Sequence, residues 1–326
     1  MKIRQTSSKL TFGNYLNHWL ARWGVRRMGY RVDPGLYALG RPTPDSPVFV
    51  SANYTLSFDV LRAALDGMDG YILVLDTKGI NVWCAASKGT FGTEELVRRI
   101  GETELAKAVN HRLLILPQLG ASGVSAHEVK KRSGFSVRFG PVRTADLPEF
   151  LKEGKATEKM RQVRFGLRER FVLIPVELVH SLPFILAGTG LAFLVGGIFS
   201  ALATVTSLVA GLVLFPVLLP WLPTRDFSSK GYILGGVAVL PFLFLILANS
   251  SGSWWSKTAA ALTWILIFPS VTAFLALNFT GSTTFTSRTG VRREIFAYIP
   301  VMAGMFGAGI VLTVVLMLIR WLGGKI

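Results

Sequence analysis

The chain has 326 residues, 51% of them apolar, and a formal charge of +16 at pH 7. A single cysteine, Cys84, excludes an internal disulfide framework and any all-cysteine zinc or iron–sulfur site. The positive charge suits nucleic acid, but no recognition motif accompanies it. We therefore expect no nucleic-acid partner and a location at the anionic cytoplasmic leaflet of a membrane.

Charge divides the chain unevenly. Of the 35 Lys and Arg residues, eight follow Arg170, and so do three of the 19 acidic residues. The start of the chain lacks an apolar stretch and predicts no cleavable secretory signal. We expect an N-terminal extension at 1–32, a soluble binding domain at 33–170 and a membrane domain at 171–326.

Strand and helix patterns alternate in the soluble part. The run Gly-Tyr-Ile-Leu-Val-Leu at 70–75 predicts a strand buried on both faces, and Ser57 is a possible helix cap. Repeated β–α order predicts an α/β fold with a parallel, Rossmann-like sheet and helices on both faces. Strands are expected at 47–52, 70–76, 112–117 and 135–139, and helices at 56–65, 93–100, 126–131 and 145–151.

Unusual residues gather after the expected strands, in the segments 53–55, 76–92, 117–121 and 140–143. Taken singly, each segment fits a simple turn. In a parallel sheet, however, ligands bind beyond the carboxyl ends of the strands. Together the four segments predict a pocket.

Five later stretches are apolar over the ~20 residues that a bilayer span needs. Basic residues gather before the first stretch and after the second and fourth, so the positive-inside rule places the soluble domain in the cytoplasm. Glu177 and His180 lie only at the edge of the first span, which favours an anchor or scaffold and leaves a conducting role open. The expected all-α membrane domain therefore has five transmembrane helices, at about 178–198, 200–222, 231–249, 258–278 and 298–319.

The one cysteine lies in the segment Asn-Val-Trp-Cys-Ala-Ala-Ser-Lys-Gly at 81–89. Most lone cysteines are small buried hydrophobes. Cys84, however, follows a strand at the expected ligand edge, and the small residues after it leave the backbone open to a flat ligand. If a helix begins at Asn81, its amides favour the thiolate, as does the charge of Lys88.

Three chemistries are compatible with such a thiolate. A cysteine hydrolase needs a base, and neither His111 nor His127 lies in a recognisable hydrolase motif. The segment Ser-Lys-Gly-Thr-Phe-Gly-Thr at 87–93 inverts the residue order of a P-loop. Metal ligation by one thiolate remains, with a cofactor supplying the other ligands.

The segment 81–89 resembles the cap-helix signature Asn-Val/Ile-Trp-Cys-Ala-Ala/Gly-Gly-Lys. That signature belongs to the membrane corrinoid proteins of bacterial and archaeal mercury methylation, the HgcA family, which is related to the corrinoid subunit of the corrinoid iron–sulfur protein. One departure is Ser87, where the family usually has glycine, since its side chain would crowd the corrin face or force the turn to adjust. The similarity continues through 35–40, 51–59, 73–79, 88–97, 117–131, 133–135, 140–143 and 176–178.

The resemblance implies a corrinoid-binding domain. It would hold a cobamide, a cobalamin-like corrinoid with cobalt, whose lower nucleotide base is displaced and whose cobalt takes Cys84 sulfur as an axial ligand. Asn81 is expected first as a helix cap, and Trp83 either packs beneath the corrin or fills the core. The implied cofactor-binding residues are Thr55, Ser57, Asn81, Val82, Trp83, Cys84, Ala85, Ala86, Ser87, Lys88, Gly89, Gln118, Leu119, Gly120, Gly140, Pro141 and Val142.

The activity implied by the resemblance is a corrinoid-dependent methyltransferase that passes a methyl group from cobalt to Hg(II), forming methylmercury. A thiolate enriches the trans methyl group in electron density, which suits its transfer to a soft electrophile. The implied partners are a methyltransferase that uses methylated folate and a ferredoxin-like reductant with two 4Fe–4S clusters. The reductant must be external because this chain cannot hold an iron–sulfur cluster on one cysteine.

Two alternatives stay open. One is a paralogous methyl carrier with another acceptor, or one that serves one-carbon metabolism like the corrinoid subunit of acetyl-CoA synthesis; Ser87 favours it. The other is a non-enzymatic membrane protein that binds cobamide for storage or uptake and has no need of the thiolate.

Overall fold

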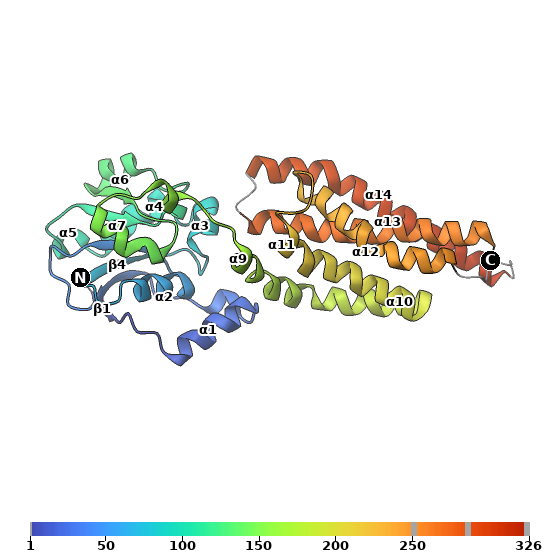
Figure 1. The fold of residues 1–326 in the computed structure, drawn as a ribbon. Helices are drawn as coiled ribbons and strands as arrows, with labels where there is room; N and C mark the ends of the chain where they lie inside the picture. Colours follow the sequence, from blue (N-terminus) through green and yellow to red (C-terminus); the bar gives the residue numbers. More distant parts are fainter. Residues whose placement is uncertain (1, 249–252, 284–287, 323–326) are drawn as a thin grey trace. The chain divides into compact units, whose positions relative to one another are not determined.

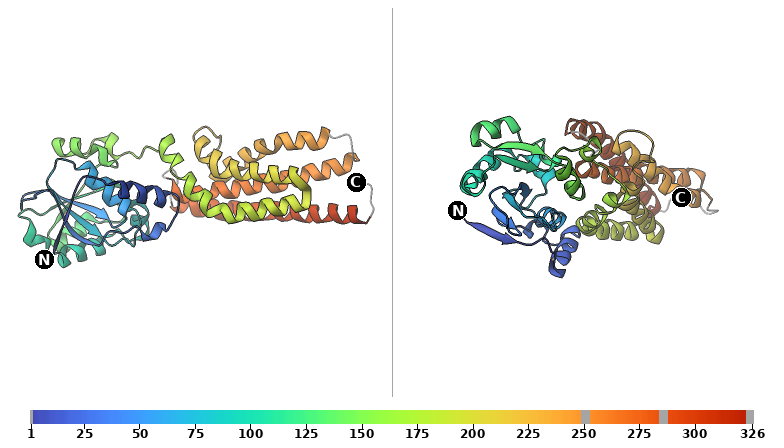
Figure 2. Two further views of the ribbon diagram at one scale, coloured as in Figure 1. Left: turned by 90° about the horizontal axis from the view of Figure 1, so that it is seen from below. Right: turned by 60° about the vertical axis from the view of Figure 1, so that its left-hand side comes forward.

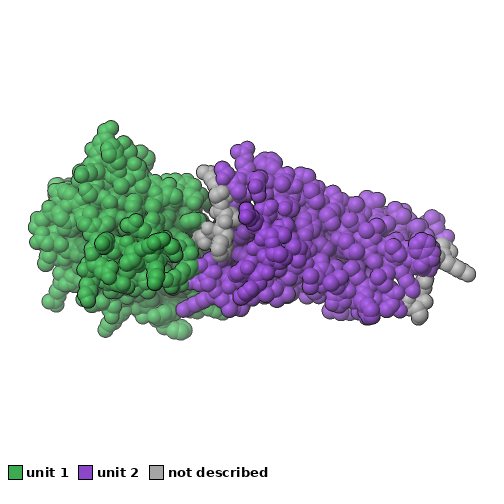
Figure 3. Space-filling model, turned by 45° about the horizontal axis from the view of Figure 1, so that its top comes forward, with its two compact units in different colours: residues 1–164 green, residues 165–326 purple. Residues whose placement is uncertain are grey.

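The computed structural model describes residues 2–248, 253–283 and 288–322. It contains two compact units, unit 1 (Met1–Arg164) and unit 2 (Phe165–Ile326) (Figure 3). Unit 1 holds a β-sheet with helices, and unit 2 holds long apolar helices (Figure 1). Asn249, the expected end of one membrane span, lies outside the described residues.

Six strands within the described residues form one mixed sheet, in the order β1-β2-β4-β3-β5-β6. The four expected strands are all present, whereas the expectation of a wholly parallel sheet is wrong, because β2 runs antiparallel to β4. Only residues 40–47 join β2 to β3, and a parallel crossover needs about a dozen residues or more. The strands are β1 (Ile3–Thr6), β2 (Gly35–Leu39), β3 (Val48–Ala52), β4 (Gly70–Leu75), β5 (Leu113–Leu116) and β6 (Ser136–Phe139).

The four strands β4-β3-β5-β6 are parallel to one another, and this order is that of a doubly wound fold. From β3 the chain first adds β4 on one side and then β5 on the other. A crevice therefore opens at the carboxyl ends of β3 and β5, where crossovers leave in opposite directions. The crossover helices are α2 (Thr55–Ala64), α4 (Thr93–Glu102), α5 (Leu105–Ala108) and α6 (Ala126–Ser133).

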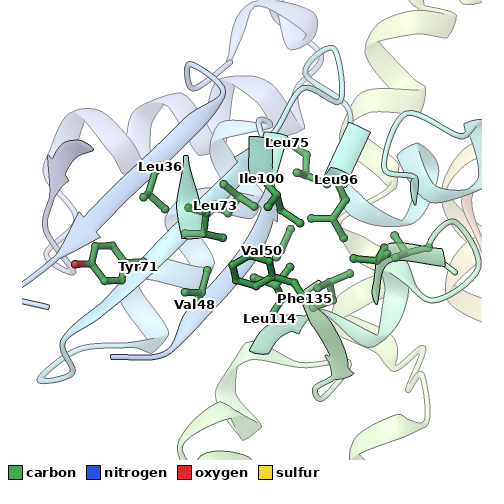
Figure 4. Packing of buried hydrophobic residues seen from close by; sticks show 14 of the residues in the cluster. Leu36, Val48, Val50, Tyr71, Leu73, Leu75, Leu96, Ile100, Leu114 and Phe135 are labelled. Carbon is green, nitrogen blue, oxygen red and sulfur yellow. The ribbon is translucent and has the colours of Figure 1, made fainter. Parts of the chain in front are cut away.

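Side chains alternate between two hydrophobic cores, one on each face of the sheet. Val48 and Val50 point into the core that Leu96 of α4 completes (Figure 4). Phe49 points into the opposite core, together with Phe58 of α2. Every residue of β4 is buried, as its continuous aliphatic run predicts.

Helix α2 begins differently from the expectation. Its first residue is Thr55, and Tyr54 is the N-cap residue without a side-chain hydrogen bond. Ser57 lies inside the first turn, where its N–H donates to the Tyr54 carbonyl at 2.9 Å. The interpretation of Ser57 as the cap is therefore wrong, and its hydroxyl is not needed to start the helix.

Four helical stretches of the described residues are long and apolar enough to cross a membrane. The first spans Leu167–Leu218 and covers two of the expected spans. The others lie at Phe227–Ala248, Trp254–Gly281 and Thr289–Trp321, and they correspond to α12 (Phe227–Ala248), α13 (Trp254–Asn278) and α14 (Arg288–Trp321).

The first stretch folds back on itself. Within α10 (Ile174–Val209), Gly196 and Gly197 leave the helical conformation, and Gly197 has a φ of 68°, which favours glycine. The Arg170 guanidinium donates to the carbonyls of Pro216, at 3.3 Å, and Val217. Contact between residues so far apart in sequence requires an antiparallel hairpin, and the ribbon follows such a path (Figure 2). The turn lies near the expected boundary between the first two spans.

Glu294 is a buried acid in unit 2. Its carboxylate accepts the backbone N–H of Ser228 at 2.6 Å, in the first turn of α12. Since the first amides of a helix have no partner within the helix, this carboxylate from α14 caps α12. Glu294 thus stabilises the packing of two helices, in keeping with a scaffold.

Candidate functional site

Cys84 lies on a short helix, α3 (Val82–Lys88), that the preceding residue caps. The Asn81 side-chain oxygen accepts the Cys84 backbone N–H at 2.9 Å, so the expected role of Asn81 as a helix cap is confirmed. Gly89 ends the helix with a φ of 81°. The Cys84 side chain is half-buried, whereas Val82, Ala85 and Ala86 of the same helix are buried.

The two alanines after Cys84 lie in a closely packed part of the domain. Ala85 and Ala86 are buried against the core, and Gly123 approaches this turn of α3. A Cβ at Gly123 would lie 2.2 Å from the Phe91 carbonyl oxygen and 3.0 Å from Ala86 Cα. The expectation that Ala85 and Ala86 leave the backbone bare for a ligand is therefore wrong.

A buried asparagine orders the loop that leads into α3. Asn53, directly after β3, accepts two backbone hydrogen bonds on its side-chain oxygen, from the Thr77 N–H at 3.1 Å and the Gly79 N–H at 2.9 Å, and the Thr77 hydroxyl lies 2.9 Å from the same oxygen. The Thr77 hydroxyl also lies 2.7 Å from the Ile80 carbonyl. Asn53, expected among the ligand-edge residues, thus fixes the position from which Asn81 and Cys84 follow.

Replacing Asn53 with alanine should destabilise unit 1. Buried donors on Thr77 and Gly79 would lose their acceptor, at a cost of about 2–4 kcal/mol of unfolding free energy. In the full chain in detergent micelles, hydrogen–deuterium exchange should accelerate at 76–84. Asn110→Ala, which removes an exposed asparagine that contacts Asp45, should leave that exchange unchanged. Equal exchange in Asn53→Ala and wild type would contradict this role.

A cavity of about 310 Å³ lies at the carboxyl ends of β3 and β5, where the doubly wound order places a ligand. Its wall is largely apolar, with a few polar groups such as the Ser57 and Thr144 hydroxyls, and this mixture is typical of small-molecule sites. Leu56 and Val60, one turn apart on α2, form part of one wall. Asn81, Val82 and Trp83 form the end of the wall next to Cys84.

The structure brings eight of the sequence-predicted site residues to this cavity. They are Ser57, Asn81, Val82, Trp83, Leu119, Gly140, Pro141 and Val142. Trp83 is therefore a wall residue of the cavity. Nine lie elsewhere: Thr55, Cys84, Ala85, Ala86, Ser87, Lys88, Gly89, Gln118 and Gly120.

These nine residues differ in their surroundings. Gly120 is buried by packing, because a Cβ there would lie 2.5 Å from the Phe91 ring. Gln118 joins two loops of the wall through its N–H, which donates to the Pro141 carbonyl at 3.4 Å. Ser87 and Lys88 are exposed on the turn that follows Cys84. Cys84 thus lies beside the cavity on an accessible surface.

Sequence reasoning missed much of the cavity wall. Leu56 and Val60 carried a signal, since both belong to the helical apolar pattern, but that pattern does not distinguish a cavity from a core. The strand residues of the cavity wall could be identified only once the order of the strands in the sheet was known. The missed residues are Phe49, Val50, Ser51, Leu56, Val60, Leu61, Ile115, Leu116, Thr144 and Leu147, whereas Pro117 belongs to the segment 117–121 that was expected at the pocket.

The histidines give no support to a hydrolase. Both ring nitrogens of His111 have backbone partners, the Ser46 carbonyl at 2.9 Å and the Leu113 N–H at 3.2 Å. His127 is exposed on α6 beside Glu128. Near the start of α2, burial raises the pKa of Tyr54, and the nearby Arg27 opposes this shift. The phenol therefore stays protonated and uncharged at neutral pH.

Comparison with known proteins points to one group of complexes. Residues 25–151 match the family model of the CO dehydrogenase/acetyl-CoA synthase delta subunit. The matched segment contains α3, the strands β2 to β6 and the cavity walls. Unit 1 is similar to acetyl-CoA decarbonylase/synthase subunits. The match is consistent with the corrinoid-protein relationship that the cysteine segment implies.

Individual relatives carry the name acetyl-CoA decarbonylase/synthase complex subunit gamma. The one from Methanopyrus kandleri is 36% identical over 126 residues, which is 38% of this chain and 27% of the relative. The one from Archaeoglobus fulgidus is 33% identical over 129 residues, 39% of this chain and 27% of the relative. The one from Methanocaldococcus jannaschii is 32% identical over 123 residues, 37% of this chain and 25% of the relative. The chain therefore spans about a quarter of the length of these relatives.

Proposed function

We propose that the chain is a membrane-anchored, corrinoid-dependent methyl carrier in which the Cys84 thiolate binds the cobalt of a cobamide. One observation carries the proposal: a half-buried thiol lies on a capped helix, and the residues just before it, Asn81 to Trp83, form part of the wall of an apolar cavity. The similarity of unit 1 to the acetyl-CoA decarbonylase/synthase subunits supports it.

The cavity and the residues around Cys84 fit different parts of such a cofactor. A volume of about 310 Å³ suits a flat aromatic base and is too small for a corrin macrocycle, so the cavity would take the displaced nucleotide base. Trp83 and Asn81 would separate this base from the thiol, since both belong to the cavity wall. The macrocycle would then lie over the exposed side of α3, outside the cavity.

When bound, a cobamide supplies a cobalt centre that carries a methyl group to an acceptor. The protein contributes a fixed sulfur. Asn81 caps α3, and buried Val82 and Ala85 attach the helix to the core, so the backbone position of Cys84 is fixed. Lys88 is exposed one turn further on.

The proposed acceptor is Hg(II), and the support for it is the resemblance of the segment 81–89. Ser87, the departure from that signature, lies within α3 and does not have a positive φ. The backbone at this position therefore accommodates a side chain without strain, and the expected adjustment of the turn relative to the family stays a prediction. What remains is the effect of the exposed Ser87 side chain on a ligand that lies over the helix.

The remaining parts of the proposal concern the membrane and the partners. We place the binding domain at 33–170 in the cytoplasm and give the membrane domain, at 171–326 in the inner membrane, five crossings; the hairpin at Gly196 and Gly197 supports the number. The partners would be a methyltransferase that uses methylated folate and an external reductant with two 4Fe–4S clusters.

A second candidate is methyl transfer to another acceptor in one-carbon metabolism. The names of the relatives favour it, since they are subunits of acetyl-CoA decarbonylase/synthase complexes. A membrane protein that stores cobamide is a third candidate, and the accessible Cys84 speaks against it.

A single-turnover reaction tests the proposal. The full chain in nanodiscs is loaded with a methylated cobamide, mixed with Hg(II), and assayed for methylmercury, with Ser87→Gly in parallel. We expect up to one methylmercury per bound cobamide from both proteins. A methyl group that stays on the wild-type protein but leaves the Ser87→Gly protein would contradict the mercury assignment and favour the second candidate. A methyl group that stays on both proteins would also contradict the mercury assignment.

A further inference from the structure

The N-terminal helix α1 (Phe12–Arg22) has an apolar face directed away from the domain. Phe12 is 82% exposed and Trp19 is 56% exposed, although both are large apolar side chains. The exposed large apolar residues of α1 follow Phe12 after three, four and seven positions, so they share one face of the helix. They are Phe12, Tyr15, Leu16, Trp19 and the neighbouring Trp23.

The buried residues of α1 are His18 and Ala21, so its inward face carries none of the large apolar side chains. His18 is buried, and its Nε2 lies 2.7 Å from the Asp59 carboxylate of α2. The same carboxylate accepts the Arg62 Nε–H at 2.7 Å. The large apolar side chains of the helix are thus exposed, whereas in the usual arrangement they lie inside and the polar face meets water. Its attachment to α2 does not use the aromatic residues, which remain free for another contact.

The charge around this face has one sign. Residues 1–32 contain seven Lys and Arg residues and no Asp or Glu. Arg22 and Arg26, both exposed, follow the aromatic face at the end of the helix. A helix with Trp, Phe and Leu on one face and arginines beside it has the composition of an interfacial membrane helix. Tyr and Trp prefer the headgroup region, where anionic lipids attract arginine.

We propose that α1 binds the surface of a lipid bilayer, with Phe12, Leu16 and Trp19 among the headgroups and the arginines against anionic phospholipids. A protein partner would bury the aromatic residues equally well, but the cores of protein interfaces are depleted in charge, whereas here the charge is uniformly basic. The polar attachment through His18 holds the aromatic face outward. The chain would then contact the bilayer through unit 1 as well as through the apolar helices of unit 2.

A fluorescent label on α1 tests the proposal in the full chain. In a Cys84→Ser background, Leu16→Cys carries an environment-sensitive nitrobenzoxadiazole label, and His127→Cys, on exposed α6, is the matched control. The proteins are placed in nanodiscs of phosphatidylcholine with phosphatidylglycerol that contain doxyl-labelled lipid. We expect the doxyl lipid to quench the label at residue 16 and not at residue 127. Acrylamide, a neutral aqueous quencher, should quench the label at residue 127 and not the label at residue 16.

The arginines provide a second measurement. Arg22→Gln and Arg26→Gln should each lower the ratio of lipid-contacting to free α1 about fivefold, and added salt should lower it further. Nanodiscs of phosphatidylcholine alone should give the same reduction. Quenching of the residue-16 label by acrylamide and not by doxyl lipid would overturn the proposal. Protection from both quenchers would also overturn it, since a protein surface would then cover the face.

Discussion

Cys84→Ala should abolish methyl transfer to Hg(II), reducing it to the level of free cobamide, while the fold of unit 1 is preserved. The substitution removes only the sulfur that we propose as the cobalt ligand. The contact that shapes α3 uses the Cys84 backbone N–H, which alanine retains, so Asn81 would still cap the helix. The measurement is the yield of methylmercury per turnover in the full chain.

Two controls accompany this variant. Cys84→Ser keeps the approximate size of the side chain but lacks sulfur, and it should fail in the same way as Cys84→Ala. Hydrogen–deuterium exchange over 81–89 should match the wild type in both variants, which separates loss of the ligand from loss of the helix. A methylmercury yield from Cys84→Ala close to the wild-type value would refute the role of the thiolate.

Ser57→Phe should weaken cobamide binding by about tenfold to a hundredfold, because overfilling a packed site costs roughly 1–3 kcal/mol. Ser57 is half-buried on α2 and forms part of the cavity wall, so a phenyl ring there would occupy space that we assign to the nucleotide base. Equilibrium binding of cobamide to the full chain, followed by its visible absorption, gives the affinity.

Thr55 provides the matched control on the same helix. The family resemblance implies that Thr55 and Ser57 both contact the cofactor, whereas the structure brings only Ser57 to the cavity. Thr55→Phe should therefore change the affinity by no more than a few fold. If both variants lost binding equally, the cavity would not be the place of the nucleotide base.

The strands that could be predicted from the sequence are those whose signal is local. The aliphatic run of β4 is buried on both faces, and burial on both faces requires every residue to be apolar. β2 is also entirely buried but was not among the expected strands, and its direction depends on its partner β4 and on the short connection to β3. Strand pairing depends on residues far apart in sequence, so the β–α alternation does not predict the direction of β2.

The candidate site divides in the same way. The Asn81 cap could be predicted because an asparagine three residues before a helical amide is a local pattern. The small size of Ala86 was misinterpreted, since its cause is the approach of Gly123, more than thirty residues away in sequence. Composition likewise identified the apolar spans, and the basic residues on both sides of the first two predicted that the chain turns back between them, in agreement with the contact of Arg170 with Pro216.

The most direct test of the account is X-ray absorption at the cobalt edge of the full chain reconstituted with cobamide. We expect a sulfur atom bonded to cobalt in the wild-type protein and its replacement by a lighter atom in Cys84→Ala. Nitrogen and oxygen neighbours alone in the wild type, with no change in the variant, would contradict the assignment of Cys84 as the ligand.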